Sequence, residues 1–418
     1  MRYFILFLLF FFAYPYDTLW FRRFDTGTNE YGSSSTIDPE GNIILAPVPE
    51  DWSCIFIVKY SSSGEIIWTR NFNINGSPRG LACDKEGNII IIGRWQEPHR
   101  NVHVIKFSPD GETLWSRRLE LGEYGALYGV TIDDSNNIIV SGTLTESNDE
   151  DIILAKFSPS GDLIWQRIYD LGWNDWEGLY SVTLDKEGNI IGTGDYGLLD
   201  NTYFLTMKFD KNGTLIWQKS LDFEEIDTGH DIAVDSSNNI YACGVVGHDW
   251  DIFSILIKYA PNGETLFTRK YITRYENLPW GIAIDQLGNI LITGVVVKET
   301  MPRYSDCFLL KYSSNGESLF SHHYNFAFYM GGEDINLDNL NHIYISGWIG
   351  ENNNRDIYLM KLLYLPAINE KKIISLSKNR YFTEIFDITG KKIKVSKISS
   401  KGVYFLKEAK EIKKIIIY

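Results

Sequence analysis

Residues 183–217 read TLDKEGNIIGTGDYGLLDNTYFLTMKFDKNGTLIW, and this stretch contains both signatures of a unit that recurs along the chain. The first signature is an aspartate followed by a turn with Gly or Asn and then a short apolar run. Its aspartates are Asp38, Asp84, Asp133, Asp185, Asp235, Asp285 and Asp338, which lie 46 to 53 residues apart. The second signature is a Lys-Phe or Lys-Tyr pair, a turn with Gly and a Trp or Phe. A fixed period of this length indicates a repeat architecture.

Each unit predicts four short strands, which we name a to d. Strand a ends at the aspartate, whose side chain favours a turn, and strand b is the apolar run that follows. We expect strand b to end at a repeated glycine such as Gly93 or Gly142. Strand c contains the lysine and strand d the Trp or Phe. Four strands in every unit of about 50 residues are typical of a β-propeller.

The two ends of the repeat region predict how the ring closes. The seventh copy stops at YLMKLLYLP and lacks strand d, whereas DTLWFRRF at 17–24 matches strand d of the other copies. Trp20 then takes the missing aromatic position, and the first strand completes the last blade without leaving an exposed edge. We therefore predict an all-β, seven-bladed propeller of four-stranded blades over residues 17–365.

The termini predict two further segments. Residues 1–14, MRYFILFLLFFFAY, contain an apolar run that is too short for a membrane span but suits a secretory signal. We expect residues 1–16 to be the signal peptide, with an uncleaved anchor as the alternative. Residues 366–418 contain 13 Lys and Arg against 5 Asp and Glu, so they form a separate basic module.

Two resemblances accompany these patterns. Over residues 17–362 the repeat resembles a bacterial β-propeller repeat family found on secreted and surface proteins, which implies the fold more than an activity. The tail resembles a type A sorting domain of type IX secretion through FDITGK (386–391), KGVYF (401–405) and KKII (413–416). This implies a small antiparallel β-module that is read by the secretion machinery, and a secreted or cell-surface protein. A basic stabilising extension is the alternative for residues 366–418.

Composition limits the classes of partner. The net charge of −14 over 418 residues argues against a general nucleic-acid binder. The four cysteines, at 54, 83, 243 and 307, have no metal-site spacing and are expected to be buried, with one chance bridge left open. No motif predicts a cofactor or metal, and GTGDYG at 192–197 belongs to the repeat. The LIW runs also resemble those of quinoprotein propellers, which usually have eight blades and calcium-linked quinones. We expect a monomer that meets membranes only through its signal or surface attachment.

The residues that recur in every copy are expected to build the blades. The turn aspartates shape strands a and b, and the lysines of strand c can pack their stems between blades. These lysines are Lys59, Lys106, Lys156, Lys208, Lys258, Lys311 and Lys361. The aromatic position of strand d holds Trp20, Trp68, Trp115, Trp165, Trp217, Phe267 and Phe320. Because Phe can replace Trp there, this position predicts packing rather than binding.

Seven other tryptophans fall in or beside the loops that vary between copies. These are Trp52, Trp95, Trp173, Trp176, Trp250, Trp280 and Trp348. Variable loops on a rigid scaffold commonly bind ligands, and Trp stacks on sugar rings or peptide side chains. They predict an aromatic platform, with the capping of blade tops as the alternative.

A second variable set lies five residues before each turn aspartate, where strand a opens at the channel mouth. It comprises Ser33, Arg79, Tyr128, Tyr180, His230, Trp280 and Glu333. Chemical diversity at a shared inner position predicts a ligand pocket, with solvated rim residues as the alternative.

The leading hypothesis is therefore an exported, non-catalytic propeller that binds a carbohydrate or a protein through its variable face. The alternative is a hydrolase or lyase that acts on glycans at the channel mouth. Glu333 with Asp334, or Asp227 with Asp231, could supply the carboxylate pair that glycoside cleavage requires. Carboxylates facing each other across the mouth would favour the enzyme, and aromatic residues without such a pair would favour the binder.

Overall fold

The computed structural model describes most of the chain. The described residues are 18–52, 54–72, 74–95, 102–119, 124–146, 149–172, 176–198, 201–248, 251–298, 304–351, 354–363, 384–387, 392–393, 402–408 and 411–417. For Ser33, Trp95, Glu146 and the strands beyond residue 383, the backbone alone is described. The sequence prediction for residues 1–16 lies outside these ranges. Within them, no helix is long and apolar enough to cross a bilayer.

Residues 18–363 form one compact unit whose strands, in the described ranges, pair in seven groups of four. We call these groups blades and number them in chain order. Blades 1 to 3 are β2 (Glu30–Ile37), β3 (Ile43–Pro49), β4 (Ile55–Tyr60), β5 (Ile66–Phe72); β6 (Gly76–Cys83), β7 (Ile89–Trp95), β8 (Val102–Phe107), β9 (Thr113–Leu119); β10 (Tyr124–Ile132), β11 (Ile138–Glu146), β12 (Asp149–Phe157), β13 (Leu163–Tyr169). Blades 4 and 5 are β14 (Trp176–Leu184), β15 (Ile190–Leu198), β16 (Asn201–Phe209), β17 (Leu215–Leu221); β18 (Ile226–Val234), β19 (Ile240–His248), β20 (Asp251–Tyr259), β21 (Thr265–Tyr271). Blades 6 and 7 are β22 (Glu276–Ile284), β23 (Ile290–Lys298), β24 (Tyr304–Tyr312), β25 (Ser318–Tyr324); β26 (Tyr329–Leu337), β27 (Ile343–Glu351), β28 (Asn354–Leu362) and β1 (Thr18–Phe24).

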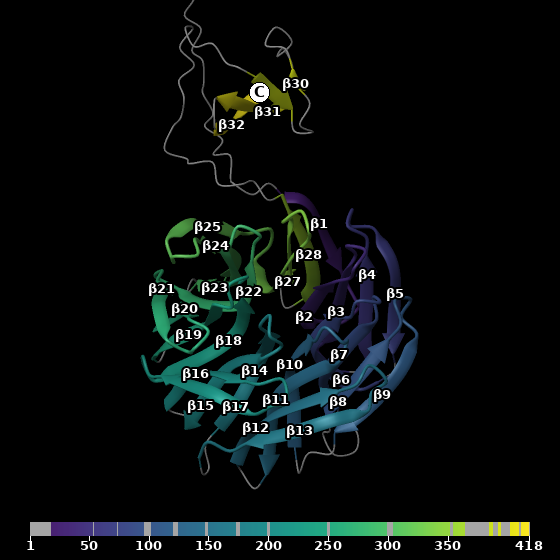
Figure 1. The fold of residues 1–418 in the computed structure, drawn as a ribbon. Helices are drawn as coiled ribbons and strands as arrows, with labels where there is room; N and C mark the ends of the chain where they lie inside the picture. Colours follow the sequence, from purple (N-terminus) through teal and green to yellow (C-terminus); the bar gives the residue numbers. More distant parts are fainter. Residues whose placement is uncertain are drawn as a thin grey trace, which may run out of the picture. The chain divides into compact units, whose positions relative to one another are not determined.

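The blades surround a central axis, with the first strand of each blade innermost (Figure 1). The predicted β-propeller is confirmed. Within the blades all described pairings are antiparallel, and single parallel pairs join β12 to β14 and β24 to β26. The ring closes between blades 7 and 1, where Ser35 N donates to Asp334 Oδ2 at 2.7 Å.

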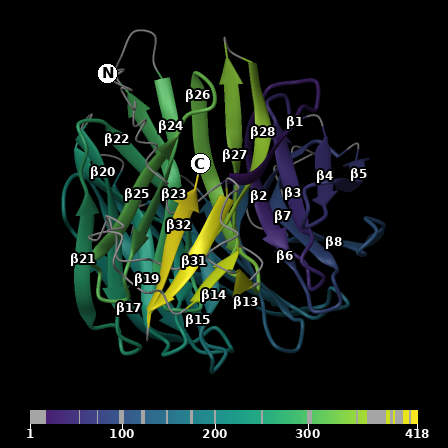
Figure 2. The same ribbon diagram turned by 90° about the horizontal axis from the view of Figure 1, so that it is seen from above.

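The predicted closure by the N-terminal strand is also confirmed. Strand β1 pairs antiparallel with β28 along its length, and Trp20 lies opposite Lys361 (Figures 1 and 2). The two ends of the repeat region therefore share one blade. Because strands of this blade come from both ends, the ring cannot open without breaking a strand pairing.

The repeated aspartates and lysines form the same network in most blades. In blade 4, Asp185 Oδ1 accepts from the N–H groups of Glu187 and Asn189 at 3.0 and 2.8 Å. Its Oδ2 accepts from Asn189 Nδ2 and from Lys208 Nζ, both at 2.9 Å. The carboxylate thus shapes the turn between strands a and b and binds it to strand c. These contacts lower the pKa of Asp185, and hydrogen bonds within the equivalent turns lower the pKa of the other six aspartates.

Neighbouring blades are connected through one backbone carbonyl in the turn between strands c and d. Trp217 Nε1 and Lys208 Nζ of blade 4 both donate to the carbonyl of Pro261 in blade 5, at 3.2 and 3.3 Å. The same double contact joins blade 1 to the carbonyl of Pro109 and blade 2 to that of Pro159. At the closure, Trp20 Nε1 and Lys361 Nζ share the carbonyl of Ser62, at 3.4 and 3.0 Å.

The glycine of that same turn lies against the aromatic ring. Gly263 has φ +84°, and a Cβ there would lie 2.9 Å from the Trp217 ring. Gly64 has the same relation to Trp20, and Gly316 to Phe267. Glycine meets both requirements, since it tolerates positive φ and leaves room for the ring. The repeated Trp, Gly and Lys are therefore structural residues.

The core lies between blades rather than within them. Strand b is apolar on both faces, and all seven residues of β3 are buried. Ile191 of blade 4, for example, packs in one cluster with Ile240 and Ile257 of blade 5. The four cysteines, all described, are free thiols, and three of them are buried.

One expectation about strand b was wrong, because the repeated glycine lies inside the strand. Strand β11 continues from Gly142 to Glu146, and β7 continues past Gly93. A Cβ at Gly142 would overlap the carbonyl oxygen of Ala126 in strand a. The glycine is needed because strand a bulges at this level and brings its backbone close to strand b.

The second compact unit contains a four-stranded antiparallel sheet within the described part of the tail. Its strands are β29 (Glu384–Asp387), β30 (Lys392–Ile393), β31 (Gly402–Glu408) and β32 (Glu411–Ile417), in the order β30-β29-β31-β32. The small antiparallel module predicted from the sequence is confirmed.

The contacts that Trp20 makes at the ring closure predict a loss of stability when its side chain is shortened. We expect Trp20→Ala to lower the free energy of unfolding by about 2 kcal/mol, since it removes a half-buried ring and the bond to Ser62. Trp20→Phe should cost about 1 kcal/mol or less, because Phe267 and Phe320 occupy this position in other blades. Urea denaturation measures both.

The matched control is Leu19→Ala, which truncates an adjacent side chain that is 47% exposed. It should change stability by less than about 0.5 kcal/mol. Equal effects of Leu19→Ala and Trp20→Ala would contradict the role assigned to the closing contact.

Candidate functional site

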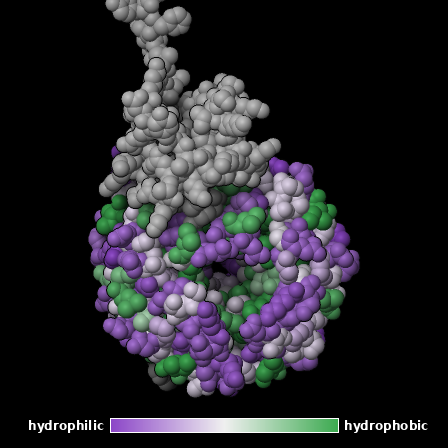
Figure 3. All heavy atoms as spheres, turned by 45° about the horizontal axis from the view of Figure 1, so that its top comes forward, coloured by the Kyte–Doolittle hydropathy of each residue, from purple (hydrophilic) through white to green (hydrophobic). Residues whose placement is uncertain are grey.

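A cavity of about 910 Å3 lies on the axis of the ring and is lined mainly by the first strands of the blades. It opens on the face shown in Figure 3, where the centre of the ring is hollowed. Six of the seven mouth positions predicted from the sequence line it: Arg79, Tyr128, Tyr180, His230, Trp280 and Glu333. We call these the rim residues. Of the seventh, Ser33, only the backbone is described, and its neighbours Gly32 and Ser34 line the cavity.

A β-bulge explains why these positions face the axis. The register of strands a and b shifts at each rim residue, as between Leu127 and Gly129 around Tyr128. The same shift surrounds His230 and Trp280. A bulge leaves one residue unpaired and redirects its side chain, and it increases local twist. The rim residues are therefore free of the alternation that a regular strand would impose.

His230 and Trp280 form a stacked pair on neighbouring blades. Their ring centroids are 4.4 Å apart and their planes differ by 4°. His230 Nδ1 lies 2.7 Å from the carbonyl oxygen of Pro279, which can only accept, so Nδ1 carries the proton. Burial lowers the pKa of His230 to about 4, and the imidazole is neutral above pH 5. Trp280 remains 41% exposed.

Two tyrosines and a carboxylate form a second group on blades 3 to 5. The rings of Tyr128 and Tyr180 meet edge to face at 5.2 Å. Tyr180 donates to Asp195 Oδ1 at 2.7 Å, and Thr228 donates to Asp195 Oδ2 at 3.1 Å. Burial raises the pKa of Asp195 to about 6. Both oxygens of Asp195 are thus occupied, and the group forms a polar wall held by hydrogen bonds.

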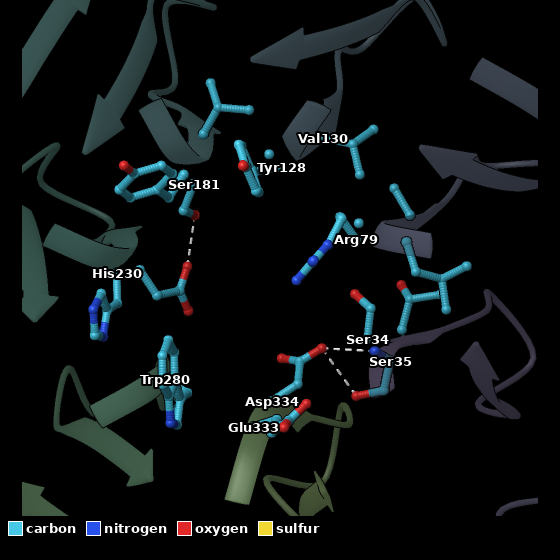
Figure 4. Close-up of a pocket in the computed structure, with 18 of the residues that line it drawn as sticks. Ser34, Ser35, Arg79, Tyr128, Val130, Ser181, His230, Trp280, Glu333 and Asp334 are labelled. Atoms are coloured by element: carbon cyan, nitrogen blue, oxygen red, sulfur yellow. Dashed lines mark hydrogen bonds between the residues drawn. The ribbon is translucent and has the colours of Figure 1, made fainter. Parts of the chain in front are cut away.

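Asp231 and Asp334, which follow the rim residues His230 and Glu333 in the sequence, also line the cavity. Each of them accepts hydrogen bonds from a neighbouring blade. Asp231 accepts from Ser181 Oγ at 2.6 Å and from Ile282 N at 2.8 Å, which joins blade 5 to blades 4 and 6. Asp334 accepts from the N–H and hydroxyl of Ser35 in blade 1 (Figure 4). Burial raises the pKa of Asp231 to about 7 and raises that of Asp334.

The charges of the cavity are unevenly distributed. Among the described lining residues, Arg79 is the one Lys or Arg, and the carboxylates are Asp195, Asp231, Glu333 and Asp334. Arg79 extends into the cavity from the side opposite His230 and Trp280 (Figure 4). Glu333 lies against Gly32 of blade 1, where a Cβ would overlap its carboxylate. The cavity is therefore acidic on the side of blades 4 to 7.

The structure brings only part of the predicted tryptophan set into this cavity. Of the described lining residues Trp280 is the one tryptophan. Trp348 packs beside the apolar cluster of blades 7 and 1, with the Arg355 guanidinium 4.8 Å from its ring centroid. Trp52 lies in a turn at φ 51°, and Trp176, at the start of β14, is 48% exposed. The side chain of Trp95, and all of Trp173 and Trp250, lie outside the described residues.

Of the two carboxylate pairs predicted from the sequence, one lies in the cavity lining and the other does not. Glu333 and Asp334 both line the cavity. Asp227 is fully buried and accepts from Phe223 N and Glu224 N, away from the lining, so the pair Asp227–Asp231 is not assembled there. No group of three or more His, Cys, Asp or Glu in the described ranges could hold a metal ion.

Sequence reasoning missed the lining role of Asp195 and underrated that of Asp231. A signal for Asp231 and Asp334 was present, because the position four residues before the turn aspartate is Gly or Ser in the other blades. Asp at a position that holds Gly or Ser in the other blades indicates that blades 5 and 7 differ from the rest at the cavity. Asp195 lies in strand b, and its approach to Tyr180 depends on the pairing of β14 with β15.

Comparisons with known proteins show the fold. No protein-family model matches the chain, and no curated protein matches it either. Virginiamycin B lyase from Staphylococcus aureus, a catalytically inactive variant with quinupristin, is 12% identical with a TM-score of 0.56, over 83% of this chain and all of that one. A PL25 ulvan lyase bound to -[GlcA(1-4)Rha3S]- is 10% identical with a TM-score of 0.52, over 83% and 96%. BBS1N in complex with ARL6DN is 9% identical with a TM-score of 0.51, over 84% and 97%. The chain thus shares the propeller-like fold of two lyases and of a protein bound to another protein.

The raised pKa of Asp231 predicts a dependence of stability on pH. The folded pKa of about 7 exceeds the usual value of about 3.9, so the native state binds this proton more tightly than the unfolded state. Its contribution to stability therefore falls as pH rises from about 4 through 7. We expect Asp231→Asn, whose amide can still meet Ser181 and Ile282, to reduce the loss of Tm between pH 5 and pH 8.

Asp210→Asn is the control, because hydrogen bonds in its exposed turn lower the pKa of Asp210 below this window. It should leave the change of Tm between pH 5 and pH 8 as in the parent. A parent-like slope in Asp231→Asn would mean that Asp231 is ionised in the folded protein throughout.

Proposed function

We propose that the protein binds a carbohydrate chain at the mouth of the central cavity, without catalysis. The observation that carries this proposal is the Trp280 ring, which remains 41% exposed inside a cavity and is held in place by His230. An aromatic ring that is exposed inside a cavity, rather than on the outer surface, offers a ligand a flat apolar face to cover. The C–H face of a sugar ring is the partner that a fixed indole suits best.

The surroundings of Trp280 support this choice. A volume of about 910 Å3 falls within the range of small-molecule pockets and accommodates several sugar units. Arg79, Tyr128 and Glu333 supply donors and acceptors elsewhere in the cavity lining. Hydroxyl groups of a sugar can bind such groups on several sides at once, whereas a flat protein surface would not enter the cavity.

A second candidate is a hydrolase or lyase that acts on glycans, and one observation favours it. His230 is neutral, and because Nδ1 donates to Pro279, its Nε2 carries a lone pair that can accept a proton. Tyr180 and Glu333 line the same cavity and could donate or accept a proton. Turnover of any bound glycan decides between the two candidates.

Export is the remaining part of the proposal. We propose that residues 1–16 direct the chain out of the cytoplasm and that the C-terminal module serves sorting or surface attachment. The four-stranded sheet of the tail and the motifs at 386–391 and 401–405 support this role.

Replacing Trp280 tests the binding proposal. We expect Trp280→Ala to weaken binding of a glycan identified on an array by about tenfold or more, because it removes the stacking surface. Isothermal titration gives the affinity, and product analysis of the same mixture reports any turnover. Trp165→Phe, at a position of strand d where Phe occurs naturally, is the matched control and should bind as the parent.

Trp348→Ala separates the cavity from the wider aromatic platform. Because Trp348 does not line the cavity, the cavity proposal expects parent-like affinity for this variant. A large loss in Trp348→Ala with none in Trp280→Ala would place the ligand on the loops instead.

Truncation tests the tail. A chain ending at Leu365 keeps every described strand of the propeller, and we expect it to fold but to be retained in the cell. Fractionation of the native host, with the full chain as reference, measures the exported share. Normal export of the truncated chain would remove the sorting role.

A further inference from the structure

We infer that the cavity selects a sugar that carries a protonated amine, with the ammonium group seated at Trp280 between the acids of blades 5 and 7. This inference rests on the proposed function and names the class of carbohydrate. It follows from the order of the blades around the axis, which places acids on both sides of the exposed indole.

The backbone around Trp280 brings these acids close. Trp280 lies on blade 6, and Ile282 on the same strand donates its N–H to Asp231 of blade 5 at 2.8 Å. On the other side, a Cβ at Gly281 would lie 3.2 Å from Cα of Asp334 on blade 7. The residue that follows Trp280 is therefore in contact with blade 7, and the residue after that is bonded to blade 5. Glu333 precedes Asp334 and also lines the cavity.

A cavity that holds an exposed indole and carboxyl groups on the two adjacent blades can take a cation in chemical terms. The π face of an indole attracts an ammonium group, and it does so more strongly when water is partly excluded. Carboxylates on the adjacent blades can add charge-assisted hydrogen bonds to the N–H groups. A hydroxyl or an acetamide group at the same place is uncharged, so both the attraction to the indole and the hydrogen bonds to the carboxylates would be weaker.

The single cation of the described lining belongs to another part of the ring than Trp280. Arg79 comes from blade 2 and enters from the opposite side of the cavity, and the acids belong to blades 4, 5 and 7. A ligand carboxylate or sulfate near Trp280 would meet Asp231, Glu333 and Asp334. Like charges disfavour that placement, so the seat discriminates against acidic sugars.

The protonation of Asp231 is expected to respond to a bound cation. Burial and, to a smaller extent, the charge of Asp334 raise the pKa of Asp231 to about 7. Asp231 also faces the Cys243 thiol, whose pKa is raised by burial and by that carboxylate. A bound ammonium group would favour the ionised form of Asp231, and the proton it displaces would pass to solvent.

The test compares two ligands that differ mainly in charge. The full chain is titrated at pH 6 with the tetramer of glucosamine, whose amines are protonated, and with the tetramer of N-acetylglucosamine. We expect the glucosamine tetramer to bind at least about tenfold more tightly. Its affinity should fall as salt is raised from 50 to 500 mM, since screening weakens charge pairs at an open site.

Variants identify the seat. Glu333→Gln and Asp231→Asn should each weaken binding of the glucosamine tetramer by about fivefold to tenfold and change binding of the acetylated tetramer by less than twofold. Using two variants covers the case in which one of them fails to fold. Glu112→Gln removes an exposed charge from the turn between β8 and β9, outside the cavity lining, and controls for net charge.

The outcomes separate this inference from the proposed function. Equal or tighter binding of the acetylated tetramer overturns the amine selectivity and leaves carbohydrate binding in place. Binding of neither tetramer overturns both. Selectivity that persists unchanged in Glu333→Gln and Asp231→Asn would place the ammonium group elsewhere and overturn the seat at Trp280.

Discussion

The contact on which the structure depends is the pair of hydrogen bonds that joins each of blades 1, 2, 4 and 7 to the next blade. A Trp of strand d and a Lys of strand c donate to one carbonyl of the following blade, and the glycine of that turn lies under the indole. The lysine also pairs with the turn aspartate of its own blade. One repeated set of residues therefore controls the turn within a blade and the spacing between blades. Burying a lysine and an aspartate is favourable here because every polar atom of the pair finds a partner.

This arrangement separates structural residues from variable ones. Contacts between blades use the turn between strands a and b and the turn between strands c and d, where the repeat is strict. The bulge in strand a lies outside that network. The bulged backbone of strand a needs space beside strand b, and a glycine such as Gly142 or Gly194 provides that space. The rim residue can therefore differ from blade to blade without changing the ring. The side chains that line the cavity can vary at little cost in stability.

The acids of the cavity have two roles that act together. Asp231 and Asp334 connect neighbouring blades through Ser181, Ile282 and Ser35, so they are part of the ring. They also leave negative charge at the axis, beside the exposed indole of Trp280. Burial raises the pKa values of both carboxyl groups, because it disfavours their charged forms. The same side chains thus hold neighbouring blades together and line the cavity.

The sequence alone was sufficient for the fold, because a strict period of about 50 residues leaves few architectures and the N-terminal Trp20 matches the strand that the last copy lacks. It also identified the rim positions, since they share one offset from the turn aspartate. It could not predict which loop tryptophans reach the cavity, because loop paths depend on contacts between blades that have no periodic signal. Nor could it predict the stacking of His230 on Trp280 or the acids on either side of that indole. Those neighbours are about 50 residues apart in the chain, and only the closed ring, which places successive strands a side by side around the axis, brings them together.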